Sequence, residues 1–403
     1  MSWQIIGAIS ASAFCGILFT VFLGREALSV LDGIIVWIGT RPFRAAVLMP
    51  LAGLLVFYAG AKPPPAPSAG PELYADKLAT PFEGNATYIG WKRTAGRIEG
   101  LFTIKAGKPA KPEKGGRSKL TVGYTPFSTG KKQSVKLDKS AYPVAGGNPA
   151  VDIPWIGRAA FGGKSLEGLG SDLQAGADLA KSKDKTVKTA ANARLARMNG
   201  TWTFAFETDA GYAGFSLTVK KGKGKLAGTL PDGTKVSASQ QGILGDKALA
   251  IPFVCAKKGS VGLVFWLSEG GAAKLSDLTP LKLANGTVLE ASLVGQPGAA
   301  HRLANGGGHV FETPFFSQAF EVKGKKWDFP KHVAKPTAAK PDLNPYSVKL
   351  KFTEKTGVVK GSFSIPSPTG KAQKYTVNGV VVGGTFYGSA FAKGQSPVPC
   401  AAE

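Results

Sequence analysis

Short runs of β-branched and aromatic residues, separated by Gly, Lys, Asp or Pro, recur through most of this chain. Examples are TWTFAF at Thr201–Phe206, FSLTV at Phe215–Val219 and VGLVFWL at Val261–Leu267. Runs of this length and composition are typical of short β-strands. The dipeptides Asp232-Gly233 and Asn378-Gly379 favour tight hairpin turns, because glycine adopts positive φ freely. The sequence therefore predicts an all-β fold.

An internal repeat indicates how the strands are arranged. The segment LTVKKGKGKLAGTL from Leu217 matches the segment LKFTEKTGVVKGSF from Leu350. Each reads as strand, Lys/Gly turn, strand, Gly/Pro turn and strand, and Phe102–Val135 reads as a degenerate third copy. One such meander cannot bury its apolar face alone, so the copies must stack or close. We predict antiparallel meander modules that form barrel- or sandwich-like domains behind an N-terminal hydrophobic helical region.

Two apolar runs without a charge, Ile5–Leu23 and Ala45–Ala61, form that N-terminal region. In one interpretation both runs cross a membrane and the arginines between them stay inside the cell. In another, Arg41–Ala61 is a signal peptide with a basic start, an apolar centre and a small-residue cleavage pattern. A buried helical hairpin in a soluble core is the third. The first two predict an exported protein of the bacterial cell envelope or extracellular space, and the membrane-spanning one also predicts a membrane partner for residues 1–61.

Composition divides the chain into seven segments. We predict a transmembrane hairpin or late signal peptide at 1–61, a Pro-rich linker at 62–72, a β module at 73–160, a Gly-broken helical or loop connector at 161–198, a β module at 199–322, a Pro-rich wrap or linker at 323–345 and a C-terminal β module at 346–403.

The formal net charge of +24 lies almost entirely after residue 61 and comes mostly from lysines in predicted loops. Such a charge favours binding to polyanions. Outside the cell these are envelope glycans and lipid head groups, whereas nucleic acid is not an expected partner. In the alternative interpretation the lysines only keep exposed strands from pairing with neighbours. The candidate polyanion contacts are Lys220, Lys221, Lys223, Lys225, Lys325 and Lys326.

Two other sets of residues are candidates for a role. Cys255 and Cys400 are expected either to form a disulfide, as exported cysteines often do, or to be two separate buried thiols. Trp202, Trp266 and Tyr387 lie on predicted strands, where they form either a platform for sugar stacking or part of the buried core.

Motifs for catalysis and for cofactor or metal binding are incomplete. Gly157–Ser165 resembles a phosphate-binding loop but has one residue too many between its glycines. Ser128 and Lys131 fit Ser-x-x-Lys without the Ser-Asp-Asn partner of penicillin-binding proteins. The three histidines are not close in sequence. We therefore predict no catalytic, metal or cofactor-binding residues.

The C-terminal segment carries a resemblance. The runs VKLKFTEKTGVVKGSF at Val348–Phe363, GVVVGG at Gly379–Gly384 and YGSA at Tyr387–Ala390 resemble repeated Gly/Lys-rich β-meander modules of uncharacterised exported bacterial proteins, most clearly over residues 344–403. The resemblance implies export and β structure but no activity. The expected function is a non-catalytic, structural or adhesive envelope protein. The alternatives are a binding module for anionic glycan or another polyanion, and an enzyme of unknown type.

Overall fold

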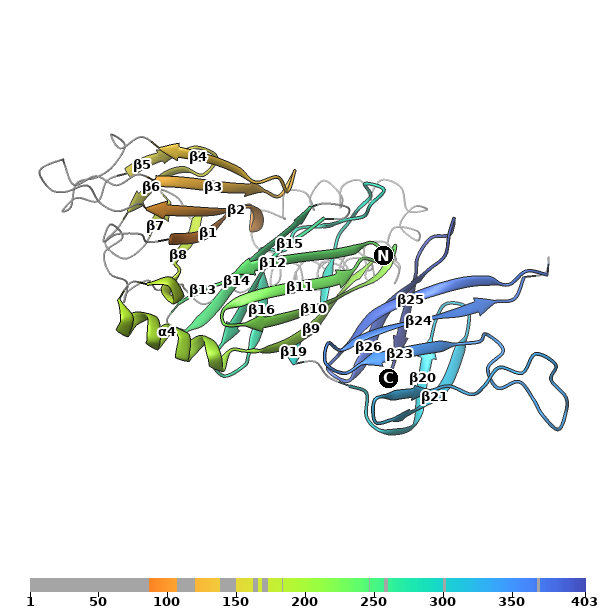
Figure 1. Cartoon of the computed structure of the whole chain (residues 1–403). Coiled ribbons are helices and arrows are strands. Elements are labelled where there is room, and N and C mark those ends of the chain that lie inside the picture. The colour runs from red at the N-terminus through yellow and green to blue at the C-terminus, as the bar shows by residue number, and fades with distance from the viewer. Residues whose placement is uncertain are drawn as a thin grey trace, which may run out of the picture. The chain divides into compact units, whose positions relative to one another are not determined.

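The structure is a computed structural model of the 403-residue chain. It describes residues 87–106, 120–137, 150–161, 166–168, 173–182, 184–245, 247–256, 260–299, 302–367 and 370–403. These residues fold into antiparallel β-sheets, with a single α-helix among them (Figure 1). The predicted all-β class and antiparallel pairing are confirmed. The predicted N-terminal helical region and the linker at 62–72 lie outside the described residues and remain predictions.

The first sheet has the strand order β4-β3-β2-β1-β8. Its strands are β1 (Thr87–Thr94), β2 (Arg97–Ala106), β3 (Leu120–Pro126), β4 (Gln133–Leu137) and β8 (Leu173–Ala177). Side chains with a period of two, such as Tyr88, Phe102 and Val122, are buried on one face. That face packs on Ile153 and Ile156. These two isoleucines flank the turn of a small sheet made of β5 (Ala150–Ile153), β6 (Gly157–Phe161) and β7 (Leu166–Gly168).

The second and third sheets share the largest core. The second sheet has the order β12-β11-β10-β9-β19, with β9 (Gly200–Thr208), β10 (Gly211–Lys220), β11 (Lys223–Thr229), β12 (Lys235–Gln241) and β19 (Ser292–Ala299). The third contains β13 (Ile243–Leu244), β14 (Ala248–Ala256), β15 (Ser260–Ser268), β16 (Ala273–Ser276), β17 (Leu281–Lys282) and β18 (Val288–Leu289). Phe204 and Phe215 of the second sheet and Phe265 of the third are fully buried between them.

One helix, α4 (Lys185–Arg197), follows the 3₁₀ turn η4 (Leu179–Lys181) and covers an end of this core. It begins after Asp184, whose Oδ1 accepts the backbone N–H groups of Thr186 and Val187 at 2.8 and 3.2 Å. Such a cap satisfies N–H groups that have no partner inside the helix. The segment expected to be a helical or loop connector thus contains α4 together with β7 and β8.

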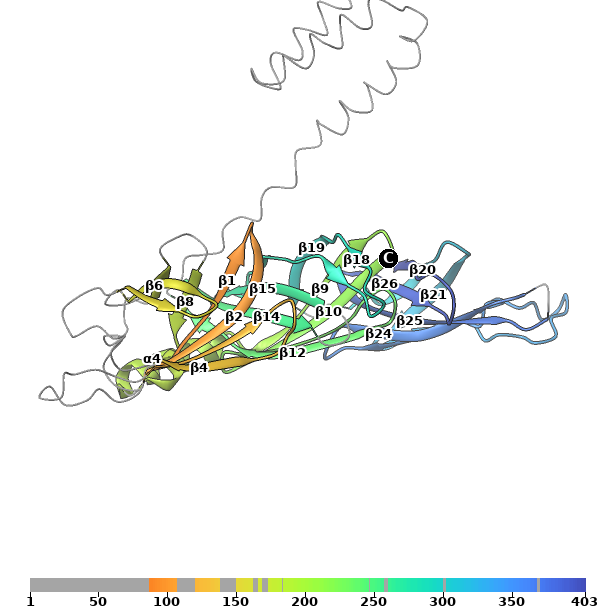
Figure 2. The same cartoon turned by 90° about the horizontal axis from the view of Figure 1, so that it is seen from above.

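The fourth sheet is nearly closed into a barrel. Its eight strands have the order β22-β21-β20-β27-β26-β25-β24-β23, and the two end strands β22 and β23 contact each other. The strands are β20 (Gly306–Glu312), β21 (Ser317–Lys323), β22 (Lys326–Asp328), β23 (Lys349–Thr353), β24 (Val358–Ile365), β25 (Gln373–Val382), β26 (Thr385–Phe391) and β27 (Val398–Ala402). They lie together in Figure 2, and their interior is rich in aromatic residues, among them Phe311, Trp327 and Phe363.

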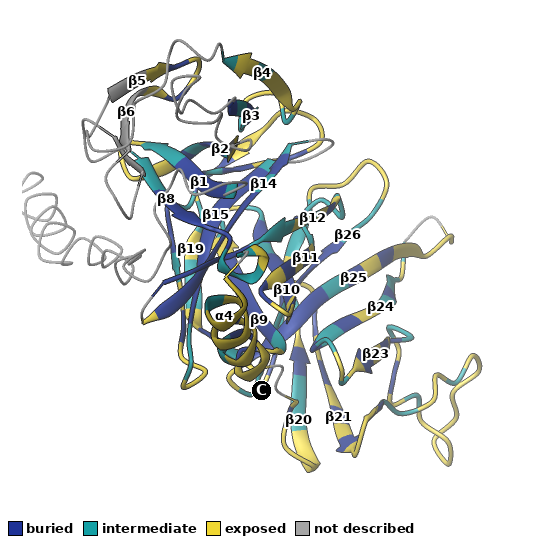
Figure 3. Cartoon of the chain, turned by 60° about the vertical axis from the view of Figure 1, so that its left-hand side comes forward, coloured by how far each residue is buried: buried dark blue, intermediate teal, exposed yellow. Residues whose placement is uncertain are grey.

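Neighbouring sheets also pack through their second faces. Alternate side chains of β14 are buried against the second sheet, and the side chains between them are buried against the first. Most of this strand therefore has the dark blue of buried residues in Figure 3. Trp91 of the first sheet meets Trp266 of the third edge to face, with ring centroids 5.8 Å apart. The second sheet contacts the fourth through Ala205, Val380 and Val382. Burial on both faces explains why several strands read as continuous apolar runs.

The segments of the predicted repeat pair as meanders, and the repeat itself remains a prediction. The strands β10–β11–β12 and β23–β24–β25 each pair consecutively, and β2–β3–β4 do the same. The first and second sheets share a further feature, since in each a fifth strand, β8 or β19, returns to lie beside the first strand of a four-stranded meander.

Two sequence-based expectations are corrected by the fourth sheet. The β modules predicted at 199–322 and 346–403 do not follow the sheets, because β20 and β21 belong with β23–β27. The cause is a long-range pairing of β20 with β27, in which Phe311 lies opposite Ala402. Asn378-Gly379 is not a turn but lies inside β25, with Gly379 opposite Gly388. Asp232-Gly233 does form a turn, in which the Gly233 N–H donates to the Leu230 carbonyl at 2.9 Å.

Candidate functional site

The hairpin between β10 and β11 concentrates four of the predicted lysines. Lys220 and Lys223 lie directly opposite each other, and the turn residues Lys221 and Gly222 have φ of 51° and 74°. Two consecutive residues with positive φ are the requirement of a type I′ turn, which suits the twist of a hairpin. Lys225 lies two residues after Lys223 and therefore on the same side of the sheet. All four lysines are exposed.

The surroundings of these lysines carry hydroxyl groups instead of acids. Lys225 lies opposite Thr218 on one side and Ser239 on the other. The hydroxyls of Thr201 and Thr218 are 3.3 Å apart. Among the described residues, no carboxylate forms an ion pair with Lys220, Lys221, Lys223 or Lys225. We call these four lysines, with Thr201, Thr218 and Ser239, the lysine face.

The hairpin between β21 and β22 provides a comparison within the same chain. In both hairpins the tip is capped by an asparagine that comes earlier in the chain. Asn199 Oδ1 accepts the Lys221 N–H at 2.7 Å, and Asn305 Oδ1 accepts the Gly324 N–H at 3.1 Å. Lys323 and Lys326 lie directly opposite each other, as Lys220 and Lys223 do. The two tips therefore share the asparagine cap and the facing lysines, but not the turn conformation, because only Gly324 of the second turn has a positive φ, of 62°.

Charge separates the two hairpins. Lys326 pairs with Asp328 at 3.3 Å, and Lys325 pairs with Glu354 at 2.6 Å. Lys323 contacts Glu321 at 2.8 Å and Asp328 at 3.2 Å. Hydrogen bonds from Lys323 and Lys326 hold the pKa of Asp328 below its usual value. The predicted contacts Lys325 and Lys326 are thus neutralised by their own neighbours.

The aromatic residues proposed as a sugar platform are placed differently. Trp202 and Trp266 are buried, with 6% and 5% of their surface exposed, so they belong to the core. The Trp266 Nε1–H donates to the Ser276 hydroxyl at 2.8 Å. Tyr387 is half-buried and packs on Tyr212, with ring centroids 5.3 Å apart. The stacking interpretation is wrong for the two tryptophans, because a second sheet covers each face on which they lie.

The two cysteines do not form the expected disulfide. Cys255 lies in the core between the second and third sheets, and Cys400 lies in the core of the fourth sheet. Both are free and buried, so the alternative of two separate thiols holds. Burial raises the pKa of the Cys255 thiol to about 12 and raises that of Cys400 as well. Neither thiol is therefore a nucleophile at neutral pH.

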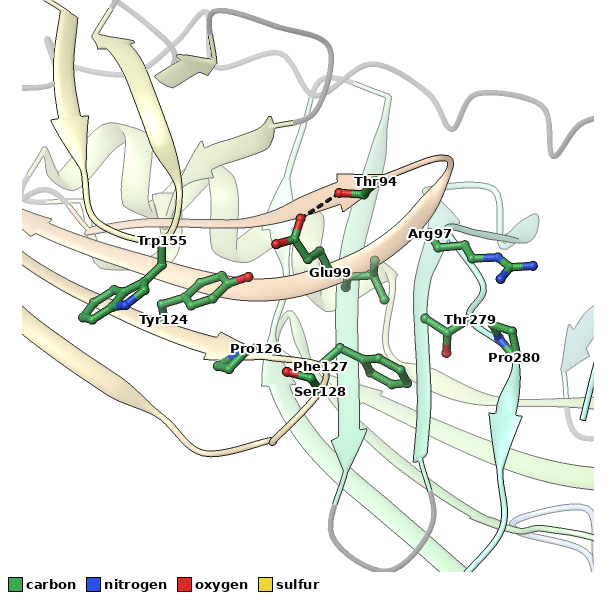
Figure 4. A pocket seen from close by; sticks show the side chains of 11 residues that line it. Thr94, Arg97, Glu99, Tyr124, Pro126, Phe127, Ser128, Trp155, Thr279 and Pro280 are labelled. Atoms are coloured by element: carbon green, nitrogen blue, oxygen red, sulfur yellow. Dashed lines mark hydrogen bonds between the residues drawn. The ribbon is translucent and has the colours of Figure 1, made fainter. Parts of the chain in front are cut away.

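A pocket of about 520 Å³ lies where the first and third sheets meet. Figure 4 shows Trp155 and Tyr124 at one end of it and Arg97 at the other, with Glu99 between them. Phe127 comes from the end of β3, and Thr279 and Pro280 come from the loop before β17. The full lining is Thr94, Arg97, Ile98, Glu99, Tyr124, Pro126, Phe127, Ser128, Trp155, Thr279 and Pro280. We call it the aromatic pocket.

Trp155 has an unusual backbone conformation for its type. The Ile156 N–H donates to the Ile153 carbonyl at 3.2 Å, and Pro154 and Trp155 form the centre of this turn. Trp155 has a φ of 69°, at the position that a type II turn normally gives to glycine. The left-handed conformation costs a non-glycine residue about 1 kcal/mol or more. Trp155 is nevertheless 40% exposed, so its ring adds little to the buried core.

The tyrosine under this tryptophan is fixed by packing. The rings of Tyr124 and Trp155 are stacked with an interplanar angle of 9° and centroids 6.3 Å apart. A Cβ on Gly100 would lie 2.5 Å from the Tyr124 hydroxyl, so only glycine there lets the ring lie flat across β2. Burial, and to a smaller extent the negative charge of the nearby Glu99 carboxylate, raise the pKa of Tyr124 to about 12. The Tyr124 hydroxyl is therefore neutral at physiological pH.

The polar groups of the aromatic pocket have opposite charges. Glu99 accepts a hydrogen bond from Thr94 Oγ1 at 2.7 Å and pairs with Lys92 at 3.2 Å. Among the residues that the structure describes, the ion-pair partner of Arg97 is Glu290, at a long 3.5 Å, and both side chains are mostly exposed. The pocket thus offers an acceptor and a donor without a dominant charge. The site was not predictable from the sequence, because its residues come from four separate segments and the local signal is limited to a tryptophan after proline in a turn.

A buried carboxylate joins the first and third sheets near this pocket. Asp277 Oδ2 accepts hydrogen bonds from Trp91 Nε1 at 3.2 Å and from the Ser276 hydroxyl at 3.0 Å. Loss of hydration on burial raises the pKa of Asp277. This rise is opposed only in part by the hydrogen bond from Ser276, the charge of Arg93 and the hydrogen bond from Trp91. The charged form is thus less favourable in the folded protein than in water.

Asp277→Asn is expected to raise the melting temperature at pH 7. Because the pKa is raised on folding, the folded state holds the proton more tightly than the unfolded chain. The contribution of Asp277 to stability is therefore greatest below the ordinary carboxyl pKa of about 3.8. It falls as the pH rises from that value to the higher pKa of the folded state. Thermal unfolding of both proteins at pH 3 and pH 7 checks this. The gain should be present at pH 7 and shrink at pH 3, and a lower melting temperature at pH 7 would contradict it.

The incomplete motifs do not assemble into a reaction centre in the described part of the chain. Ser128 lines the aromatic pocket from a turn, and Lys164 and Ser165 lie outside the described residues. His309 contacts the backbone carbonyls of Ala304 and Glu403 at 2.9 and 2.8 Å. Among residues whose placement is described, no group of three or more His, Cys, Asp or Glu side chains is arranged to hold a metal ion.

The comparisons with known proteins give no family. No protein-family model matches the sequence, and no curated protein matches it. Within the described ranges, no helix is long and apolar enough to span a membrane.

Proposed function

We propose that this protein is an exported, non-catalytic protein of the bacterial cell envelope, with a structural or adhesive role, that binds anionic polymers through its lysine face. The observation that carries the proposal is the difference between the two hairpins. Both place two lysines directly opposite each other, and repulsion between these like charges destabilises such a pair. The β21–β22 hairpin offsets this with three carboxylates, whereas the lysine face has none among the described residues.

A polyanion supplies the missing negative charge. Lys220, Lys223 and Lys225 lie on the same side of the sheet as the three hydroxyls, and Lys221 lies at the adjoining tip. A polymer with sulfate, phosphate or carboxylate groups contacts several of these groups at once. Each exposed pair contributes little, about 0.2–1 kcal/mol, and the contacts add up over a repeating ligand. The apolar runs at the N-terminus, which lie outside the described residues, motivate the proposed export and tether.

Binding of dextran sulfate to the full-length chain tests the proposal, with uncharged dextran as the control polymer. We expect binding to dextran sulfate that weakens as salt is added, because exposed charges are screened, and no binding to dextran. The triple variant of the lysine face, Lys220→Ala, Lys223→Ala and Lys225→Ala, should lose about tenfold in affinity at low salt.

The matched control is the triple variant Lys323→Ala, Lys325→Ala and Lys326→Ala, which removes the same net charge. These lysines are already paired, so we expect a loss of less than about twofold. Equal losses in both variants would show that net charge alone attracts the polymer and would remove the lysine face from the proposal. The absence of binding at low salt would overturn polyanion binding altogether.

A further inference from the structure

The aromatic pocket is independent of the lysine face and requires an explanation of its own. Its most exposed aromatic residue, Trp155, has a backbone conformation that favours glycine, and the residues that flank it, Ile153 and Ile156, supply the buried contacts of the turn. A residue kept where the fold disfavours it points to a role outside folding. The role must use the part of the indole ring that faces solvent.

The shape of the pocket limits what fits. A volume of about 520 Å³ is within the usual range of small-ligand sites. The Trp155 ring stacks on Tyr124, and Trp155 is 40% exposed, so part of an oriented indole ring is open to an occupant. The face of an aromatic ring carries partial negative charge, and the axial C–H groups of a sugar ring carry partial positive charge. A flat ring with C–H groups on one face and hydroxyls on its edge is complementary to this surface.

The polar groups limit the charge of the occupant. Glu99 is already paired with Lys92, and Arg97 with Glu290, so these two lining residues leave no dominant charge to attract an ion. A hydroxyl group satisfies both residues, since it donates to the carboxylate and accepts from the guanidinium. Thr279 and Ser128 add two hydroxyls to the lining. The occupant is therefore rich in hydroxyl groups and uncharged.

We propose that the aromatic pocket binds one uncharged pyranose unit of a saccharide, stacked on Trp155, with Glu99 and Arg97 contacting its hydroxyls. The proposal does not depend on the polyanion site, which uses other residues and opposite chemistry. A protein with both sites holds a charged polymer and a neutral sugar at separate places.

Saturation-transfer NMR of the full-length chain with cellotriose, maltotriose, chitotriose and mannotriose tests the proposal. Concentrations up to about 10 mM cover the weak affinities of single sugar contacts, since a Kd of about 1 mM is typical of the weak end of specific binding. We expect at least one of the four to bind, with strong transfer to the ring C–H protons. Failure of all four to bind would overturn the proposal and leave polyanion binding untouched.

Trp155→Gly is the decisive variant, because glycine suits the backbone of the turn. We expect a melting temperature within about 2 °C of the parent and at least a tenfold loss of affinity for the sugar. Glu99→Gln keeps the aromatic pair and is expected to lose about fivefold, since a hydrogen bond to a charged acceptor becomes one to a neutral acceptor.

Phe315→Ala is the matched control for these variants. Phe315 is 44% exposed and packs on Tyr375 with ring centroids 5.4 Å apart, but it lies in the fourth sheet region and not in the pocket. Its removal should leave sugar binding unchanged. Sugar binding that survives Trp155→Gly, or that is lost in Phe315→Ala, would show that the aromatic pocket is not the site. Binding of a proline-rich peptide that Trp155→Gly abolishes, with no sugar bound, would also overturn the proposal.

Discussion

Trp91→Ala is expected to lower the free energy of unfolding by about 4 kcal/mol. Trp91 has none of its surface exposed and meets Trp266 edge to face, where the first sheet packs on the third. Its removal leaves a large cavity between the two sheets. It also takes one of two donors away from the buried carboxylate of Asp277, which then keeps a single side-chain hydrogen bond, from Ser276.

Urea unfolding followed by far-UV circular dichroism measures the effect. Trp91→Phe keeps an aromatic ring but loses the N–H and part of the indole volume, so it should cost about 1–3 kcal/mol. Trp155→Gly serves as the exposed-tryptophan control and should change stability by less than about 1 kcal/mol, because relief of the left-handed backbone offsets the lost stacking. Similar losses for Trp91→Ala and Trp155→Gly would contradict the idea that the first and third sheets depend on Trp91.

The strands and their meander pairing were predictable because they are local. Apolar alternation and Gly/Lys turns lie within a few residues of one another, as in the repeat that begins at Leu217 and Leu350. The sheet boundaries were not predictable, because the pairing of β20 with β27 joins residues such as Phe311 and Ala402. A pairing over that distance leaves no signal in the spacing of either strand.

The sites were predictable only in part for the same reason. The positions of the lysines at hairpin tips follow from the sequence, whereas their ion pairs do not. Lys325, for example, pairs with Glu354, which lies in the loop between β23 and β24. Trp202 and Trp266 look like surface aromatics when one face of a strand is assumed to be open. Here both faces of the third sheet are covered, so the period of two does not separate inside from outside.

Glycine placement shows the limit most clearly in the β25–β26 hairpin. The Asn378-Gly379 dipeptide predicts a turn, but the turn is formed by Gly383 and Gly384, which have φ of 60° and 93°. Gly379 has another role. A Cβ there would lie 2.2 Å from the Tyr387 carbonyl oxygen, so glycine allows the close approach of β26. The backbone of Gly379 also lies near β10 of the second sheet, because a Cβ on Gly214 would be 3.2 Å from the Gly379 Cα.

Gly379→Ala is therefore expected to destabilise the protein by about 3 kcal/mol, because the methyl group would collide with the Tyr387 carbonyl oxygen and the Gly388 Cα and force β25 away from β26. Gly384→Ala is the control within the same hairpin. Its Cβ meets open space, so only the backbone conformation resists it and the cost should be about 1 kcal/mol. Urea unfolding of both variants decides between the two roles of glycine. A larger loss for Gly384→Ala than for Gly379→Ala would show that turn geometry, and not close packing of the sheets, dominates at this hairpin.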